Sequence, residues 1–146
     1  NYFNYDGELH AKIAREQWGW EAADKEFDRT FRKISNLDDM HENGVHDYLK
    51  YIKIGYGRGT DHANYAIREG KMTREEGIKM VEKYDHVRPS DLARWLKYVD
   101  MTEAEFNRIA DTFRDSRVWS QKDGYWVKDT IRGVEQRYEK VAEQLS

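Results

Sequence analysis

Residues 55–63, Gly-Tyr-Gly-Arg-Gly-Thr-Asp-His-Ala, combine the residue types that bind anions. Glycines at alternate positions let the backbone approach a ligand and adopt positive φ angles. A helix that starts here presents unpaired N–H groups and the positive end of its dipole to an anion. Arg58 can donate paired hydrogen bonds to a phosphate or a carboxylate. Spacing alone leaves two interpretations, an anion site and a glycine-rich turn between helices.

The segment is neither a Walker loop nor a dinucleotide fingerprint. No Gly-Lys-Ser/Thr follows the glycines, and no clear buried strand precedes them. A stripe of basic side chains does lead into the segment, because His46, Lys50 and Lys53 recur at i, i+4 and i+7 on one helix face. Such charge is usually solvated surface. The alternative is that the stripe faces the same ligand as Arg58.

Other reactive residue types give weaker signals. Asp61 and His62 are neighbours, and neighbouring helical residues point about 100° apart, so we expect no acid–base dyad. His41 and His46 are five residues apart, a poor spacing for one metal ion on a helix, and we expect no metal site. The chain has no Gly-x-Ser-x-Gly elbow and no cysteine, so the catalytic residues stay unidentified.

The composition is that of one soluble domain. The chain has 146 residues, 36% of them charged and 14% aromatic, with a mean hydropathy of −1.05. A net charge of −3 gives no reason to expect a nucleic acid partner. No apolar run approaches the roughly 18 residues of a membrane span, and the absence of cysteine fits the cytoplasm. Because the chain starts at Asn1 without a signal pattern, we expect the natural N-terminus to lie upstream.

The apolar spacing predicts a mainly α fold built as an array of short helices. Residues 1–6 resemble the end of a strand, and a helix is expected over 7–17. Segment 18–37 is ambiguous, and 35–39 reads as a loop or cap. From Val45 a helix with one apolar face is expected to run to Gly55. That face contains Val45, Tyr48, Leu49 and Ile52.

Several local signals place the remaining elements. Thr60 or Asp61 is expected to cap a helix that ends at Gly70. Thr73-Arg-Glu-Glu76 and Thr102-Glu-Ala-Glu105 are capping boxes, the second with Met101 and Phe106 as a hydrophobic staple. Residues 89–91 begin a short helix, and Asp123-Gly124 marks a β-hairpin near 118–128. An amphipathic helix is expected over 131–146, because Ile131, Val134, Tyr138, Val141 and Leu145 have heptad-like spacing.

Several motifs occur in one order, SNLDDMHENGVHDYLKYIKIGYGRGTDHANYAIREGKMTREEGIKMVEKYD and then DMTEAEFNRIADTFRDSRVW with the hairpin. Over about residues 35–130 they resemble the C-terminal part of bacterial N-acetyl sugar amidotransferases. These enzymes of lipopolysaccharide biosynthesis belong to the PP-loop ATP pyrophosphatase superfamily, an α/β fold. The resemblance implies that 1–20 cross over from a nucleotide-binding domain and that 21–130 form the helical C-terminal domain. Residues 131–146 have no counterpart.

The resemblance also implies a reaction and its partners. ATP with Mg²⁺ activates the acetamido group of a nucleotide-linked sugar, and ammonia from a separate glutaminase subunit displaces the oxygen to give an acetamidino sugar. The Ser-Gly-Gly-x-Asp-Ser loop that binds ATP in these enzymes is absent from this sequence, so we expect no cofactor in this chain and no ATP hydrolysis by the chain alone.

The residues that match the family pattern are the substrate-side candidates. They are His46, Lys50, Lys53, Gly55, Gly57, Arg58, Thr60 and Asp61. The family often has alanine at the position of Gly59, so Gly59 is not expected to act in the mechanism. The alternative function is a non-catalytic helical interaction module, which docks a glutaminase or a second copy of the chain through the final helix.

Overall fold

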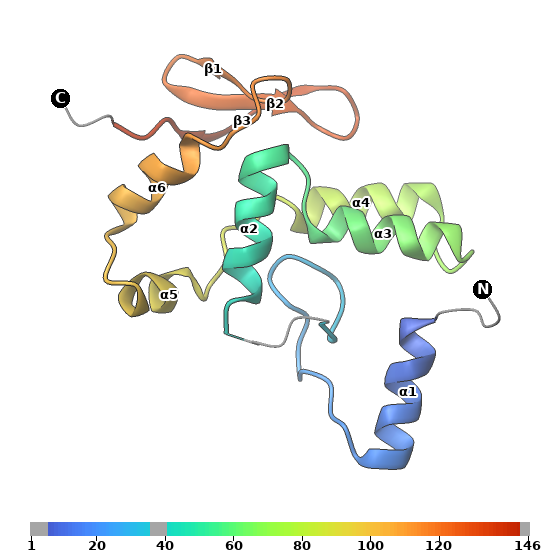
Figure 1. Cartoon of the computed structure of the whole chain (residues 1–146). Helices are drawn as coiled ribbons and strands as arrows, with labels where there is room; N and C mark the ends of the chain where they lie inside the picture. Colours follow the sequence, from blue (N-terminus) through green and yellow to red (C-terminus); the bar gives the residue numbers. More distant parts are fainter. Residues whose placement is uncertain (1–5, 36–40, 144–146) are drawn as a thin grey trace.

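A computed structural model describes residues 6–35 and 41–143 (Figure 1). Its described part contains six helices followed by a three-stranded antiparallel sheet, which confirms the mainly α fold with a small hairpin. The helices are α1 Gly7–Trp18, α2 Asn43–Ile54, α3 Arg58–Arg68, α4 Arg74–Tyr84, α5 Leu92–Tyr98 and α6 Glu103–Asp111. The strands are β1 Ser120–Lys122, β2 Tyr125–Asp129 and β3 Glu135–Lys140, in the order β1-β2-β3.

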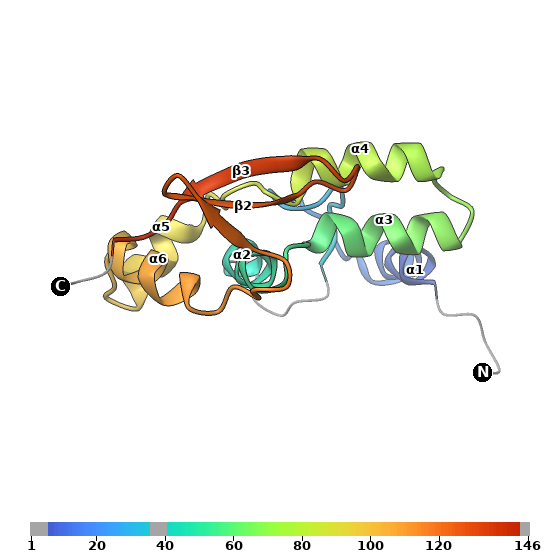
Figure 2. The ribbon, with the colours of Figure 1, turned by 90° about the horizontal axis from the view of Figure 1, so that it is seen from above.

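Helix α2 is the centre of the molecule. Figure 1 shows the α3–α4 hairpin on one side of it and α5 with α6 on the other. Seen from above in Figure 2, β2 and β3 run across α2 from the α5–α6 side toward α4. The core joins α2 to side chains of α5, α6 and the sheet. Its buried members are Val45, Tyr48, Tyr51, Ile52, Leu92, Leu96, Phe106, Ala110, Trp119 and Trp126.

The predicted apolar face of α2 is confirmed except at one position. Val45, Tyr48 and Ile52 are almost fully buried, whereas Leu49 is 37% exposed. Tyr51 is buried in its place, and its ring meets Trp119 and Tyr138 edge to face. Aromatic rings from the C-terminal sheet therefore determine which face of α2 is buried.

The ambiguous segment before α2 is irregular. Between residues 19 and 35 the chain folds back on itself through a hydrogen bond from the Ala23 N–H to the Lys33 carbonyl, 3.0 Å long. Arg29 anchors it: this side chain is 1% exposed and donates to the carbonyls of Asp85 and Val87. Its guanidinium also lies over the rings of two α2 tyrosines, 5.1 and 5.3 Å from their centroids. One buried arginine thus fixes a segment that has no helix or strand of its own.

Local signals predicted several helix ends correctly. The expected helix near the N-terminus is α1, and Asp6, the last residue of the expected strand, is its N-cap. The other residues of that strand, 1–5, lie outside the described part, as do 36–39 of the expected loop. Both capping boxes are confirmed, at the starts of α4 and α6. The hairpin is also confirmed, with Asp123 and Gly124 at positive φ in its turn.

The amphipathic helix expected over 131–146 is wrong. Residues 135–140 form β3, which pairs with β2 after a tight turn in which Gly133 has a φ of 73°. Tyr138, expected on a helical stripe, packs its ring on Trp119 across the sheet. Pairing with β2 satisfies the backbone N–H and C=O groups of this segment and outweighs the apparent heptad spacing. Leu145, the last residue of the expected stripe, lies outside the described residues. Among the described helices none is long and apolar enough to cross a bilayer.

Candidate functional site

The glycine-rich segment does bind an anion, and that anion is a side chain of the same protein. The carboxylate of Asp85, at the end of α4, accepts hydrogen bonds from the Gly57 N–H at 2.8 Å and the Thr60 N–H at 3.0 Å. It also accepts one from the Thr60 hydroxyl at 2.5 Å. Asp85 is 4% exposed. These N–H groups at the start of α3 are therefore already occupied by a buried carboxylate.

The glycines make this close approach possible. A Cβ added at Gly57 would lie 3.0 Å from Asp85 Oδ1, and one at Gly59 only 2.7 Å from the same atom. Glycine is favoured at position 55 for a different reason: Gly55 ends α2 with a φ of 77°, in the left-handed region. Gly59, which is not expected to act in the mechanism, is thus a packing residue in this chain.

The expected caps of α3 were misplaced. The helix begins at Arg58, with Gly57 as its N-cap, so Thr60 and Asp61 lie inside its first turn. The Thr60 hydroxyl points to Asp85, and the Asp61 carboxylate meets Lys50 Nζ at 2.5 Å. One of the two side chains was expected to cap this helix, but Thr60 and Asp61 each bind a charged side chain from elsewhere in the fold instead.

Arg58 is held by a buried aspartate of α2. Its Nε and Nη2 donate to Asp47, with distances of 3.0 and 2.7 Å to Oδ1, and Asp47 is 6% exposed. Its third nitrogen, Nη1, lies 4.0 Å from Asp61. The hydrogen bonds to Asp47 raise the pKa of Arg58. The guanidinium is therefore charged and fixed in orientation, and Nη1 is its donor least committed to the protein.

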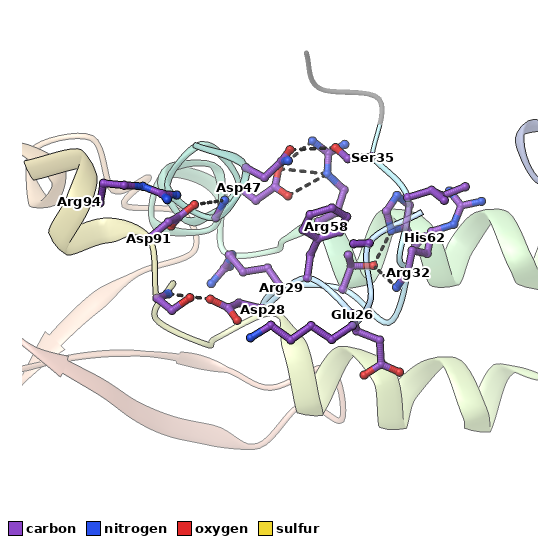
Figure 3. A pocket seen from close by; sticks show the side chains of 18 residues that line it. Glu26, Asp28, Arg29, Arg32, Ser35, Asp47, Arg58, His62, Asp91 and Arg94 are labelled. Carbon is purple, nitrogen blue, oxygen red and sulfur yellow. Dashed lines mark hydrogen bonds and ion pairs between the residues drawn. The ribbon is translucent and has the colours of Figure 1, made fainter. Parts of the chain in front are cut away.

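A cavity of about 240 Å³ opens beside Arg58, between the irregular segment, α2 and the start of α5 (Figure 3). Figure 3 shows Asp91 and Arg94 at one end, His62 and Arg32 at the other, and Arg58 between them. Five basic side chains line it, Lys25, Arg29, Arg32, Arg58 and Arg94, together with the acids Glu26, Asp28, Asp47 and Asp91. Such a wall suits a polar ligand that carries negative charge at one end.

His62 is a neutral hydrogen-bonding group in this wall. Its Nδ1 lies 2.6 Å from the hydroxyl of Thr30, and its ring meets Phe31 edge to face. Burial, with the nearby charges of Arg32 and Arg58, lowers the pKa of His62 to about 4. Its neighbour Asp61 is paired with Lys50.

The predicted site residues do not converge on one cavity. Arg58 lines the 240 Å³ cavity, whereas Gly55 and Thr60 line a second one of about 390 Å³ between α2, α4 and the sheet. His46 contacts Asp47 Oδ1 at 3.1 Å, next to Arg58, while Lys53 is exposed further along α2. Of the stripe His46, Lys50 and Lys53, the first two belong to the charge network around Arg58.

Sequence reasoning missed several residues of the site. Asp47, Asp85, Asn43, Asp91, Arg94 and Arg29 are the main ones. Most lie far from the glycine-rich segment in sequence, so spacing gave no signal for them. Asp47 is the exception. It lies one helical turn before the basic residue Lys50, a spacing that marks it as a candidate for an ion pair. Among the described residues no three His, Asp or Glu side chains gather as a metal site.

Comparison with models of protein families gives a match. The family model described as "LPS biosynthesis protein WbpG-like, C-terminal domain" matches residues 25–132, which is more than half of the chain. That range contains α2 to α6, the first two strands and every residue that lines the 240 Å³ cavity except Ala23. A comparison with curated proteins finds no match.

Proposed function

The chain belongs to the family of WbpG-like C-terminal domains of lipopolysaccharide-biosynthesis proteins, and on that premise we propose that it forms the substrate side of a sugar amidotransferase. The enzyme converts the acetamido group of a nucleotide-linked sugar to an acetamidino group for O-antigen synthesis. ATP activates the acetamido oxygen, and ammonia from a glutaminase subunit displaces it. The proposal takes this specific activity from the resemblance that the chain bears to N-acetyl sugar amidotransferases of the PP-loop superfamily.

The position of Arg58 carries the proposal. Arg58 is the member of the predicted cluster that lines the 240 Å³ cavity, and Asp47 fixes it while leaving Nη1 least engaged. A guanidinium oriented in this way can donate to a diphosphate or a uronate carboxylate without first losing side-chain freedom. His46 contacts Asp47, the carboxylate that binds Arg58, and Lys50 contacts Asp61, the carboxylate nearest to Nη1.

The glycine-rich segment does not fit the phosphates of ATP. The N–H groups of Gly57 and Thr60 are taken by Asp85, and the glycines leave no space between that carboxylate and the backbone. The chain has no Ser-Gly-Gly sequence either. ATP and Mg²⁺ therefore belong, in this proposal, to a nucleotide-binding domain outside this chain, which keeps the role of these residues on the sugar side.

The test is steady-state kinetics of the whole amidotransferase with its glutaminase. Arg58→Met is expected to lower kcat/KM for the nucleotide sugar about 10- to 100-fold, the effect of losing a charge-assisted hydrogen bond of about 1.5–3 kcal/mol. KM for ATP is expected to stay unchanged. Unaltered kinetics for the sugar would remove the proposal.

Two control variants separate binding from folding. Arg58→Met leaves the buried Asp47 without its arginine partner, so the double variant Arg58→Met/Asp47→Asn removes the stranded charge and reports the loss of the donor alone. Arg132→Met removes an arginine that pairs with Glu75 and Glu82 on the exposed surface, and it is expected to leave the kinetics unchanged.

The alternative function was a helical interaction module that docks through the final helix. Docking through that helix is not possible, because residues 135–140 form β3 and pair within the chain's own sheet. A titration of the chain with a uridine-diphosphate sugar still separates the two functions. Shifts around Arg58 favour the amidotransferase, and their absence favours a module without substrate contacts.

A further inference from the structure

Helix α1 is attached to the rest of the molecule differently from the other described helices. None of its residues is buried, whereas each of α2 to α6 buries at least two. Two ion pairs join its start to the body of the fold: Glu8 binds Arg32 of the irregular segment, and the N-cap Asp6 lies 3.1 Å from Lys71 after α3. A helix held in this way can leave the surface without exposing a packed core.

Arg32 belongs both to this contact and to the 240 Å³ cavity. It lines the cavity, and its side chain is 24% exposed. Its Nε donates to Glu8 Oε1 at 2.9 Å, and its Nη2 donates to the same oxygen. Two donors thus share one acceptor, whereas the strongest pairing of a guanidinium uses two oxygens of its partner. Glu8 is therefore a partner that an anion with two suitably spaced oxygens can replace.

A second guanidinium lies near the same end of the cavity. Arg58 and His62 are four residues apart on α3 and so share one face of that helix. The Thr30 hydroxyl lies 2.6 Å from His62 Nδ1 and accepts the backbone N–H of Arg32 at 3.4 Å. After burial, the charges of Arg32 and Arg58 are the main causes of the lowered pKa of His62. Both cations are therefore neighbours of one imidazole, as Figure 3 illustrates.

The two guanidiniums differ in how firmly the protein holds them. Arg58 is paired with Asp47, which is 6% exposed, whereas Arg32 is paired with Glu8, whose side chain is 46% exposed. Two guanidiniums favour an anion with more than one negative charge, which a phosphate group supplies and a single carboxylate does not. His62 is neutral and adds no third charge to this end of the cavity.

We propose, resting on the role given to Arg58 above, that Arg32 and Arg58 together bind a phosphate or diphosphate group, and that this anion displaces Glu8 and releases α1. In the closed state Arg32 binds Glu8, and in the open state it binds the ligand. Because the ligand gains Arg32 only in the open state, its binding and the release of α1 are coupled, and the coupling is reciprocal. The occupancy of the cavity is thereby transmitted to α1.

The test is a titration of the 146-residue chain with inorganic pyrophosphate, without divalent cations and against sodium chloride at the same ionic strength. The salt reference is needed because screening alone weakens an exposed ion pair. Saturable binding is expected, with nuclear magnetic resonance shifts at Arg32, Arg58 and His62. At saturation, amide hydrogen exchange is expected to become faster in α1 and to stay unchanged in α4.

Glu8→Gln removes the charge that competes with the ligand and keeps the size of the side chain. It is expected to tighten pyrophosphate binding about two- to fivefold, the range of a partly exposed ion pair. Exchange in α1 should then be fast without ligand and should not respond to it.

The matched control is Glu16→Gln, which makes the same change in net charge on the same helix. Glu16 lies 3.8 Å from Lys12 within α1. This variant is therefore expected to bind pyrophosphate like the wild-type chain and to keep the response of α1.

Three results overturn the inference: no saturable binding of pyrophosphate, exchange in α1 that is unchanged at saturation, or a Glu8→Gln chain that binds no more tightly than Glu16→Gln. None of them decides the proposed function, which is read from turnover by the whole enzyme. An enzyme that depends on Arg58, but whose α1 does not respond, would keep its function and lose this coupling. A chain whose α1 responds, while Arg58→Met leaves turnover unaltered, would keep the anion site and lose the amidotransferase.

Discussion

The helices of this chain begin in two different ways. Helices α4 and α6 start with capping boxes, in which Thr73 with Glu76 and Thr102 with Glu105 satisfy the first N–H groups locally. Helices α2 and α3 have no side-chain cap of their own. Their first N–H groups donate instead to carboxylates distant in sequence, Asp91 for α2 and Asp85 for α3.

Both distant carboxylates come from the connection between α4 and α5. Residues 85–91 supply Asp85 and Asp91, and Arg29 bonds two carbonyls of the same connection. Helices α4 and α6 are therefore capped by residues of their own first turn. Helices α2 and α3, beside the cavity, depend on one connection whose position is set by the rest of the fold. The candidate site lies where the starts of helices are supported by tertiary contacts.

The largest effect is expected from Asp85→Ala. The variant removes three hydrogen bonds and leaves buried N–H groups at the start of α3 without partners, so we expect a loss of about 3 kcal/mol or more in the free energy of unfolding. Urea denaturation followed by circular dichroism measures it. A loss below about 1 kcal/mol would mean that α3 does not depend on the distant carboxylate.

Gly59→Ala is expected to cost about 1–3 kcal/mol, because the new Cβ would lie 2.7 Å from Asp85 Oδ1 in a packed interior. Asn64→Ala, on the exposed side of the same helix, is the matched control and should change little. Combining Gly59→Ala with Asp85→Ala sharpens the result. The two losses should not add, since the second change removes the atom that the first one meets. Simple additivity would contradict the proposed clash.

A smaller effect is expected from acid. Because the pKa of His62 is lowered to about 4 from an unfolded value of about 6.5, the unfolded chain binds a proton that the folded chain does not. The stability this provides is complete above pH 6.5 and is lost as the pH falls toward 4, by less than about 1.4 kcal/mol per pH unit.

Unfolding free energies measured from pH 7 to pH 5 test this expectation. His62→Gln should reduce the slope. Equal slopes for the wild-type protein and His62→Gln would show that His62 takes up its proton without unfolding.

The smallest effect is expected from the locally capped helices. Thr102→Ala and Thr73→Ala should each cost about 1 kcal/mol, the usual value of an N-cap. Amide hydrogen exchange should show the loss confined to α6 or α4. A loss of protection that spreads to α2 or α3 would remove the distinction between the two groups of helices.

Much of the fold could be predicted because its signals are local. The capping boxes, the Asp123-Gly124 turn and the apolar spacing of α2 each involve residues a few positions apart. The last strand could not be predicted in this way. Its conformation depends on pairing with β2 and on Gly133, and two heptads of apolar spacing imitated a helix.

The site was predicted in part for the same reason. Glycines followed by the start of a helix suggested a site for a ligand anion, but the sequence could not show that Asp85, 28 residues from Gly57, occupies the N–H groups there. Arg58 was identified, yet its partner Asp47 and the opposite wall with Asp91 and Arg94 come together only through tertiary packing. The polar atoms left unpaired at Asn43 and Asp91 have no counterpart in any sequence pattern.

The bond between Gly57 and Asp85 closes a ring of chain that contains both α3 and α4. In a protein without cysteine this closure is reversible and indifferent to redox conditions. The two helices also pack on one another, so we expect the hairpin to open as a single cooperative unit rather than fray from its ends. Because Arg58 is carried by this hairpin and Asp91 is not, each opening would separate Arg58 from the end of the cavity that holds Asp91 and Arg94.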